Sequence, residues 1–450
     1  MTSAKSIQKD ASGLPRRIIF DGLNLALTQG TGIATYTRTL TRVARALGYD
    51  VAVVYSASFT PANDALLREI DFFDDKRTAN TRGAKAPRRM LNYAIDQVRC
   101  HFPVKPTPIE FSGAVIARQF ADTLADLDRA FVARNLFASA DVFYSRRGAF
   151  VTLAFDPHPD IFHCTYPLPL RAKFARNVYT VHDLVPLRLP FTTLDNKRKA
   201  FGLLKKVTAE ADHIITVSEA CKRDIIQLLG VDPQRITNTY QTVAFPQEYL
   251  DRPQAAIANY LDGSFGLEMN GYLLFFGALE PKKNVGRLIE AYLTSGVEIP
   301  LILVLSPGWN NESQLRRLEE HEARSGARTN RATIRRLEFV SLSTLIALIR
   351  GARAVVFPSL YEGFGLPVLE AMLLGTPVVT SANGGLPEIT GDAALLVDPY
   401  DVEDITRAIK TITNDGDLCC ELSRRGVVQA AKFSLDRYQE RVRAVYASLV

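Results

Sequence analysis

The sequence has no long uninterrupted hydrophobic segment. Its longest apolar stretch, Leu342–Leu360, is interrupted by Arg350, Gly351 and Arg353, so we expect no transmembrane helix. The N-terminal segment MTSAKSIQKDASGLPRR also lacks the apolar core of a secretory signal peptide. The sequence therefore predicts a cytoplasmic protein, and any contact with a membrane would be peripheral, at its inner face.

Cysteines and metal-binding motifs are also scarce. The chain has five cysteines, an odd number, and no C-x-x-C pair. This pattern fits a reduced compartment better than a disulfide framework. No H-E-x-x-H motif, P-loop or cysteine cluster is present, so the sequence offers no metal site.

The charge balance is only mildly positive. The chain has 450 residues, of which 47% are hydrophobic and 23% are charged, with 54 lysines and arginines against 48 acids. This length is too great for one hydrophobic core and suggests two domains. The net charge of +6 favours anionic partners such as phosphates or acidic lipids, but it is too small for a dedicated nucleic-acid binder.

Short runs of β-branched and aromatic residues alternate with helical patterns along most of the chain. Such runs, separated by helices, indicate parallel sheets covered on both faces. The runs form two series, so we expect an α/β protein with two parallel-sheet domains. The expected strands are Arg17–Phe20, Val51–Tyr55, Ile161–Cys164, Val178–Val181 and Ile214–Val217, then Tyr272–Phe276, Leu301–Leu305, Ile334–Val340, Ala354–Phe357, Pro377–Thr380 and Ala394–Val397.

A polar segment with proline and glycine, FPQEYLDRPQAAIANYLDGSFGLEMNG, lies between the two series. We interpret it as a linker with one short helix, which places the domain boundary within residues 245–265. The expected units are an N-terminal domain over residues 1–250, a C-terminal domain over 251–430 and a terminal helix over 431–450.

The terminal segment predicts an amphipathic helix that begins after Ser434, a plausible N-cap. Its apolar residues recur at helical spacing, and such a face needs a partner in its own domain or in the first one. The face consists of Leu435, Tyr438, Val442, Val445, Tyr446 and Leu449.

Residues 71–160 interrupt the α/β pattern. Eight lysines and arginines stand between Lys76 and Lys105 against one acid, Asp96, and residues 115–139 have a helical composition. We interpret this segment as a basic, helical insertion. It could rest on an anionic membrane or form a solvated surface, and the sequence favours neither.

Two glutamates follow the expected strand Ala354–Phe357 in the stretch SLYEGFGLPVLEAML. Ligands bind at this carboxyl edge of α/β sheets. Glu362 in the glycine-rich turn could accept sugar hydroxyls, and Glu370 on the following helix could accept both hydroxyls of a ribose. Carboxylates near a helix start are also common without a function, and the spacing alone decides nothing.

The same turn offers backbone groups. Gly363 and Gly365 would let the backbone approach a ligand closely. The amides of Phe364, Gly365 and Leu366 would point outward at the helix N-terminus, where anions are favoured.

A second strand, turn and helix, FFGALEPKKNVGRLIEAY, places Lys282, Lys283 and Asn284 before a helix. Lysine beside a helix N-terminus opposes the helix dipole unless an anion such as a diphosphate is shared. The alternative is an exposed basic turn.

Three further motifs are weaker. Gly30 and Gly32 follow the first strand but lack a full G-x-G-x-x-G. His182 and Asp183 close a strand in YTVHDLVPLRLP, where a lone histidine is more often structural than catalytic. Ser218 is explained as an N-cap without any function.

Together these motifs resemble those of the retaining glycosyltransferase family 4, whose members have the GT-B fold. The resemblance is strongest over residues 270–400 and absent from 71–160. It implies two Rossmann-like domains that face a central cleft, one binding the acceptor and the other the nucleotide sugar, and a C-terminal helix that crosses back to the first domain. It rests on EGFGLPVLE, LLGTPVVTSANGGLPEITGDAALLVDP, GALEPKKN, TVHDLVPLRLP and ADHIITVSEACKRDI.

The resemblance implies a role for each matching residue. Glu370 would bind the ribose and Glu362 the donor sugar, while Lys283 would neutralise the diphosphate and His182 would lie near the sugar's exocyclic oxygen. One departure is Ala278, where many members have arginine. The implied catalytic residues are His182, Lys283 and Glu362, and the implied donor-binding residues are Gly30, Gly32, Lys282, Phe364, Gly365, Leu366 and Glu370.

The implied reaction is transfer of a hexosyl group from a nucleoside diphosphate sugar with retention, by front-face attack, without a metal or another cofactor. The motifs look most like those of bacterial mannosyltransferases of surface polysaccharide or lipopolysaccharide synthesis. GDP-mannose is therefore the first expected donor, with GDP-fucose, dTDP-rhamnose and UDP-hexoses open. The expected acceptor is a lipid-linked or glycan molecule.

Three rival classes remain at this point. Ala278 favours a catalytically inactive GT-B partner or regulatory subunit, although the intact glutamates, lysine and histidine argue against it. A GT-B phosphorylase or a nucleotide-sugar epimerase lacks support in the motifs. A nucleic-acid binder would leave the strand-end motifs unexplained.

Overall fold

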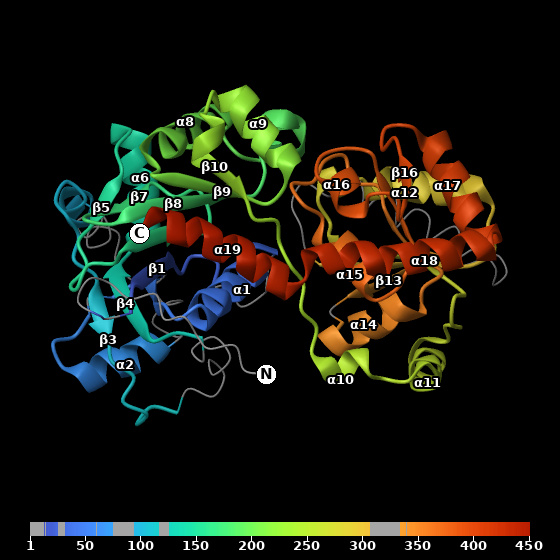
Figure 1. Cartoon of the computed structure of the whole chain (residues 1–450), viewed down its shortest axis with the longest axis horizontal. Coiled ribbons are helices and arrows are strands. Elements are labelled where there is room, and N and C mark those ends of the chain that lie inside the picture. The colour runs from blue at the N-terminus through green and yellow to red at the C-terminus, as the bar shows by residue number, and fades with distance from the viewer. Residues whose placement is uncertain are drawn as a thin grey trace.

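The computed structural model describes residues 13, 15–25, 32–59, 61–74, 94–116, 126–306, 334–338 and 340–450. Two α/β lobes lie side by side, each built on its own sheet (Figure 1). The first sheet ends in sequence at Asn238, and the second begins at Leu273.

The first sheet has eight strands in the order β10-β9-β8-β6-β1-β2-β4-β3, and its pairs are parallel except β3 with β4. Its central strands are buried along their whole length because helices cover both faces, which explains their continuous apolar sequences. Its strands are β1 (Arg17–Asp21), β2 (Asp50–Ala57), β3 (Thr107–Ile109), β4 (Arg129–Arg134), β6 (Ile161–Cys164), β8 (Arg176–Val181), β9 (His213–Thr216) and β10 (Ile236–Asn238), and β5 (Val151–Leu153) pairs separately with β7 (Leu170–Ala172).

The second sheet is parallel throughout, with six strands in the order β13-β12-β11-β14-β15-β16. Every strand expected from the sequence is confirmed in one of the two sheets. The strands are β11 (Leu273–Ala278), β12 (Leu301–Ser306), β13 (Ile334–Glu338), β14 (Ala354–Phe357), β15 (Val378–Ser381) and β16 (Leu395–Val397).

Helices fill the connections in both lobes (Figure 1). In the first lobe they are α1 (Gly32–Ala46), α2 (Ala65–Phe73), α6 (Leu136–Arg147), α7 (Val185–Arg188), α8 (Lys197–Glu210) and α9 (Glu219–Leu229), with 3₁₀ turns η3 (Pro190–Thr192) and η4 (Pro233–Arg235). The rest are α10 (Gln247–Leu250), α11 (Gln254–Phe265), η5 (Pro281–Lys283), α12 (Val285–Ser295), α14 (Leu342–Gly351), α15 (Leu366–Leu373), α16 (Leu386–Thr390), α17 (Val402–Asn414), α18 (Gly416–Ala430), η6 (Ala431–Phe433) and α19 (Leu435–Leu449).

The expectation of a helical insertion is wrong for part of residues 71–160. Arg129–Arg134, expected to be helical, forms β4, which pairs in parallel with β2 and extends the first sheet. Alanine and arginine favour helix locally, but Ala130–Ala133 is buried within the sheet, and this tertiary environment overrides the propensity. Residues 75–93, which carry most of the basic stretch, and residues 117–125 lie outside the described part of the chain.

The expected linker holds two helices, α10 and α11, instead of one. Arg350 of α14 anchors the segment between them, donating hydrogen bonds to the carbonyls of Tyr249, Leu250 and Arg252 at 2.9, 3.1 and 3.0 Å. This segment therefore packs on the second lobe.

Helix α19 crosses from the second lobe to the first and lies against α1 (Figure 1). Ser434 caps its N-terminus, as expected, by accepting from the amide of Arg437. The apolar face buries Tyr438, Val442, Val445 and Tyr446, and the Tyr446 hydroxyl lies 2.7 Å from Nδ1 of His163 on β6. The terminal helix is thus part of the first lobe's core.

Candidate active site

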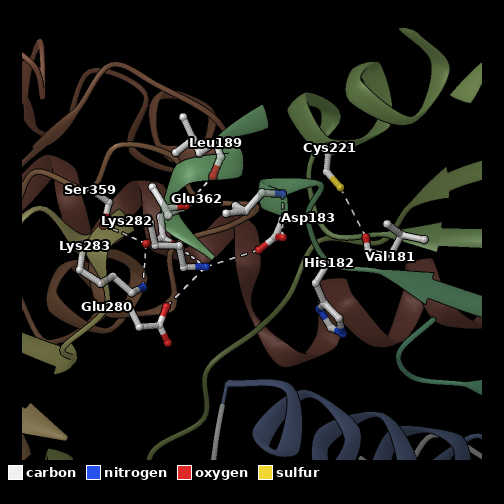
Figure 2. A network of polar contacts seen from close by, with 12 residues as sticks. Val181, His182, Asp183, Leu189, Cys221, Glu280, Lys282, Lys283, Ser359 and Glu362 are labelled. Atoms are coloured by element: carbon white, nitrogen blue, oxygen red, sulfur yellow. Dashed lines mark hydrogen bonds and ion pairs between the residues drawn. The ribbon is translucent and has the colours of Figure 1, made fainter. Parts of the chain in front are cut away.

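A cluster of two lysines and one glutamate lies at the carboxyl ends of β11 and β14 (Figure 2). Lys283 Nζ donates to Oε1 of Glu362 at 2.7 Å, and Lys282 Nζ lies 3.8 Å from Oε2. Ser359, three residues before Glu362, donates to Oε1 at 2.8 Å. The strand-end motifs that looked separate in the sequence therefore meet at one carboxylate.

Asn284 fixes the lysine turn in place. It has the left-handed φ of 61° and serves as N-cap of α12, so the chain turns sharply after the two lysines. Its buried amide donates to the carbonyls of Pro358 at 3.0 Å and Pro399 at 2.7 Å. The amide of Leu360 donates to the Lys282 carbonyl at 2.8 Å. This hydrogen bond joins the turn that carries the lysines to the turn that carries Glu362.

The lysines are neutralised by carboxylates in this structure. Besides Glu362, Lys282 Nζ lies 3.5 Å from Asp183, which follows β8 in the first lobe, and 4.0 Å from Glu280. Burial alone would lower the pKa of Lys282, but the three carboxylates raise it above its ordinary value. Burial alone would raise the pKa of Glu362, but Lys283 and Lys282 hold it below that of a free glutamate. Both shifts favour the charged forms of Lys282 and Glu362, and the contact between Lys282 and Asp183 bridges the two lobes.

Glu370 on α15 differs from Glu362 because its carboxylate has no hydrogen-bond or ion-pair partner in the described part of the chain. Burial raises its pKa to about 8. The amides of Phe364, Gly365 and Leu366 at the start of α15 also donate to no group in the described residues. Unsatisfied polar groups at a helix start are suited to a polar, anionic ligand.

Glu370→Gln is expected to change how stability depends on pH. The folded state holds the Glu370 proton more tightly than the unfolded state between about pH 4.5 and 8, so wild-type stability falls as pH rises through this window. Urea unfolding should show the variant equal to wild type near pH 4 and more stable by about 2 kcal/mol near pH 9, an amount reduced by the partial solvent contact of the side chain. Parallel pH profiles for the two proteins would contradict this assignment.

His182 follows β8 in the first lobe, and its ring points away from the lysines toward α1 (Figure 2). Its Nε2 donates to the Thr165 carbonyl at 2.9 Å, and its ring packs edge-on against Tyr36 with centroids 4.7 Å apart. Burial holds the pKa of His182 below its ordinary value. The structure therefore brings Lys282, Lys283 and Glu362 together but does not bring the imidazole into that cluster.

Gly363 allows the two lobes to meet. A Cβ at this position would lie 1.9 Å from the backbone oxygen of His182. The close approach that the sequence suggested for a ligand is thus made by the other lobe's backbone. At Gly365, a Cβ would meet a Leu386 side chain at 2.5 Å, and the φ of +105° itself favours glycine.

The glycines after the first strand are placed only in part. Gly32 begins α1, and a Cβ there would lie 3.5 Å from a methyl group of Leu366, so the start of α1 faces the start of α15. Gly30 lies outside the described residues.

Several contacts that join the lobes at α9 were not predicted from the sequence. Glu388 of α16 accepts from the backbone amides of Glu219 at 2.8 Å and Ala220 at 3.2 Å. These amides stand at the start of α9, where backbone N–H groups have no partner within the helix. Tyr361 donates to Asp224 on the same helix. Glu219 and Asp224 lie in the motif ADHIITVSEACKRDI and Glu388 lies in LLGTPVVTSANGGLPEITGDAALLVDP, but neither motif indicates that these residues meet.

Two parallel-sheet lobes that meet over a lysine–carboxylate cluster at their strand ends define a GT-B glycosyltransferase. The chain belongs to glycosyltransferase family 4, a family of retaining hexosyltransferases that use nucleotide-sugar donors. Residues 114–242 match the family described as Glycosyltransferase Family 4, and residues 263–429 match Glycosyl transferases group 1.

Bacterial mannosyltransferases are among its relatives. The chain is 36% identical over 267 residues to O-antigen chain mannosyltransferase B of Escherichia coli, covering 58% of this chain and 68% of that protein. It is 30% identical over 250 residues to O-antigen chain mannosyltransferase RfbU of Salmonella typhimurium, covering 56% and 63%. It spans only 35% of a third relative, the serotype-specific mannosyltransferase WbdA of Escherichia coli.

Solved structures share the fold across the whole chain. Anabaena Alr3699/HepE in complex with UDP and glucose superposes with a TM-score of 0.64 at 16% identity, covering 96% of this chain and 100% of that one. WaaG, a glycosyltransferase involved in lipopolysaccharide biosynthesis, gives a TM-score of 0.57 at 14% identity, covering 95% of this chain and 99% of that one.

A membrane-spanning helix would need both length and an apolar composition, and none of the helices in the described part of the chain has the two together.

Proposed function

We propose that this chain transfers mannose from GDP-mannose, with retention, to a lipid-linked, lipopolysaccharide or polysaccharide acceptor. Support comes from the relatives, of which two are described as O-antigen chain mannosyltransferases. GDP-fucose, dTDP-rhamnose and UDP-hexoses are the alternative donors, and the neighbour solved with UDP and glucose keeps the last of them open.

The observation that carries this proposal is the set of polar groups at the start of α15 for which the described residues offer no partner. The unpartnered Glu370 carboxylate would accept both hydroxyls of the ribose. The free amides of Phe364, Gly365 and Leu366 would donate to the diphosphate, as helix N-termini do for anions. Glu362 would hold hydroxyls of the donor sugar. Gly30 and Gly32 would face the donor phosphates and the acceptor.

Lys283 and Lys282 would act on the leaving group. Negative charge accumulates on the diphosphate as the glycosidic bond breaks, and preorganised cations stabilise that charge most when water is excluded. Lys282 supplies a second cation where Ala278 offers none, since its Nζ reaches the same carboxylate as that of Lys283. The diphosphate would displace Asp183 from Lys282. The leaving phosphate would then take the proton of the acceptor hydroxyl in a front-face attack, with His182 lining the sugar pocket and no metal required.

A thermal-shift panel of GDP, UDP, dTDP and ADP, each with and without EDTA, tests the proposal. A ligand that binds only the folded state stabilises it by mass action and so raises the melting temperature. At a ligand concentration a hundredfold above Kd, the free energy of unfolding increases by about 2.7 kcal/mol. We expect a selective shift with GDP that EDTA leaves unchanged. A shift with another nucleotide would change the donor, and loss of the shift with EDTA would contradict metal independence. No shift with any nucleotide would favour an inactive partner protein.

Glu370→Ala is the matched test of the donor site. Loss of hydrogen bonds to a charged group costs about 1.5–3 kcal/mol, so the Kd for the preferred nucleotide should rise roughly ten- to hundredfold. Calorimetric titration measures this, and Glu290→Ala, at an exposed position on α12, is the control. Equal affinities in the two variants would contradict the ribose assignment.

A peripheral contact with anionic membrane at its cytoplasmic face would present the lipid-linked acceptor. Exposed Val98 and Phe102 stand beside Arg99 and Lys105, a combination suited to an acidic bilayer surface. Cosedimentation with phosphatidylglycerol vesicles, but not with phosphatidylcholine vesicles, is the expected result. Equal binding to both would contradict it.

A further inference from the structure

Gln241 lies beside His182, on the segment that joins β10 to α10. Its side chain is only 7% exposed, and its Nε2 lies 3.3 Å from Nδ1 of His182. It belonged to none of the sequence motifs, because nothing in the local pattern TYQTVAFP indicates a contact with a residue 59 positions earlier.

The neighbours of His182 fix which way the Gln241 amide points. The Nε2 of His182 faces the Thr165 carbonyl, which can only accept, so Nε2 carries the ring proton. The buried imidazole is neutral, so its Nδ1 is an acceptor. Gln241 must therefore present its NH₂ group to the ring and turn its Oε1 away from it.

Among the residues that the structure describes, the Oε1 of Gln241 is a buried acceptor with no hydrogen-bond partner. Most buried side-chain polar atoms in folded proteins have at least one partner, and an exception calls for an explanation such as a missing ligand. The ligand that satisfies a lone carbonyl oxygen is a hydroxyl or amide donor.

The surroundings place this acceptor at the junction of the lobes. The preceding residue, Tyr240, has a left-handed φ of 59° and packs against Phe364 and Phe433 of the second lobe, with ring centroids 6.5 and 5.2 Å apart. Gln241 thus contacts His182 of the first lobe, and its chain neighbour Tyr240 contacts the second lobe. The lobes are in contact here, so a substrate would reach Oε1 only when they part.

We propose that Gln241 is a specificity-determining residue, whose Nε2 holds the His182 ring in place and whose Oε1 accepts a hydrogen bond from a hydroxyl of the transferred hexose. This inference rests on the proposed function, because it needs a nucleotide sugar as substrate. It assigns to the sugar, and not to the nucleotide, a contact that the donor motifs do not include.

Gln241→Met tests the proposal, because it keeps the side-chain volume and removes both amide atoms. The probes are the nucleoside diphosphate and the nucleotide sugar that wild type uses best. We expect the variant to bind the diphosphate as wild type does, to bind the nucleotide sugar at least tenfold more weakly, and to lose at least tenfold in kcat/KM. Its melting temperature should stay close to that of wild type, because the removal of an unpartnered buried acceptor is offset by the loss of the amide donor to Nδ1 of His182.

Thr413→Val is the matched control. The hydroxyl of Thr413 is also buried without a partner, but it lies at the end of α17 near Arg353, at the amino edge of the second sheet. The Thr413→Val variant should keep the wild-type kcat and KM.

Gln241→Glu is a further test. It keeps an acceptor for the sugar but places a carboxylate beside Nδ1 of His182. This carboxylate raises the pKa of His182 and should shift the acidic limb of the kcat/KM profile to higher pH.

The outcomes are distinguishable. If the wild-type protein turns over a nucleotide sugar and Gln241→Met keeps the wild-type sugar affinity and kcat/KM, this inference is wrong while the proposed function stands. Equal losses of diphosphate and nucleotide-sugar affinity also overturn it, because the effect would then be structural. A wild-type protein that turns over no nucleotide sugar overturns the proposed function and this inference with it.

Discussion

Lys283→Ala should lower kcat by about two to three orders of magnitude, while the KM for the nucleotide sugar changes less than tenfold. Removing one preorganised group that stabilises transition-state charge typically costs this much. The effect falls mainly on kcat because the charge on the diphosphate grows as the glycosidic bond breaks. Steady-state kinetics with the preferred donor measures both constants.

Two variants make this result interpretable. Lys283→Arg keeps the positive charge and should recover part of the activity, although its larger fork fits the Glu362 carboxylate differently. Lys410→Ala, at an exposed position on α17, should match wild type. If Lys283→Ala kept wild-type kcat, the assignment of Lys283 to the leaving group would be wrong.

Gly363→Ala is expected to lower kcat at least a hundredfold while the protein stays folded. The added Cβ would lie 1.9 Å from the His182 backbone oxygen, so the lobes cannot meet as they do here unless the backbone moves. Misplacing a site by about 1 Å can cost on the order of a hundredfold in rate. Solution scattering should report a larger radius of gyration for the variant, and kinetics should report the loss of kcat.

Gly263→Ala provides the matched control. A Cβ at Gly263 on α11 meets nothing within 4 Å, and alanine stabilises a helix interior by roughly 0.5–1 kcal/mol relative to glycine. This variant should keep wild-type activity and gain slightly in stability. Wild-type kcat in Gly363→Ala would show that the contact of the lobes plays no part in catalysis.

The strand framework could be predicted because its signals are local. Runs such as Ile161–Cys164 and Ala354–Phe357 are apolar throughout, which is what a strand buried on both faces requires. The position of Glu362 at a strand end and Glu370 on the next helix followed from the same pattern. Strand β4 was missed because its β signal is confined to Phe131 and Val132, between alanines and arginines that favour helix, and its burial depends on β2 lying beside it.

The contacts that assemble the site were less predictable because they join residues far apart in sequence. The ion pair between Asp183 and Lys282 and the hydrogen bond between Gln241 and His182 depend on how the lobes and the strand ends are placed. The direction of the His182 ring is set by Thr165, which belonged to no recognised motif, and by Tyr36, which lies in the motif that begins at Gly30 but carried no sign of this contact. Spacing identifies candidate side chains, but it does not determine where they point.

The crossing of α19 has a consequence for biosynthesis. His163 and Tyr446, which are hydrogen-bonded in the first lobe, are 283 positions apart in the chain. A ribosome makes the whole second sheet before α19 emerges, so the first lobe waits through that synthesis with the surface for Tyr438 and Tyr446 uncovered. The first lobe therefore completes its core only after the second lobe has been made, and we expect its N-terminal half to be the part that most needs protection from aggregation during translation.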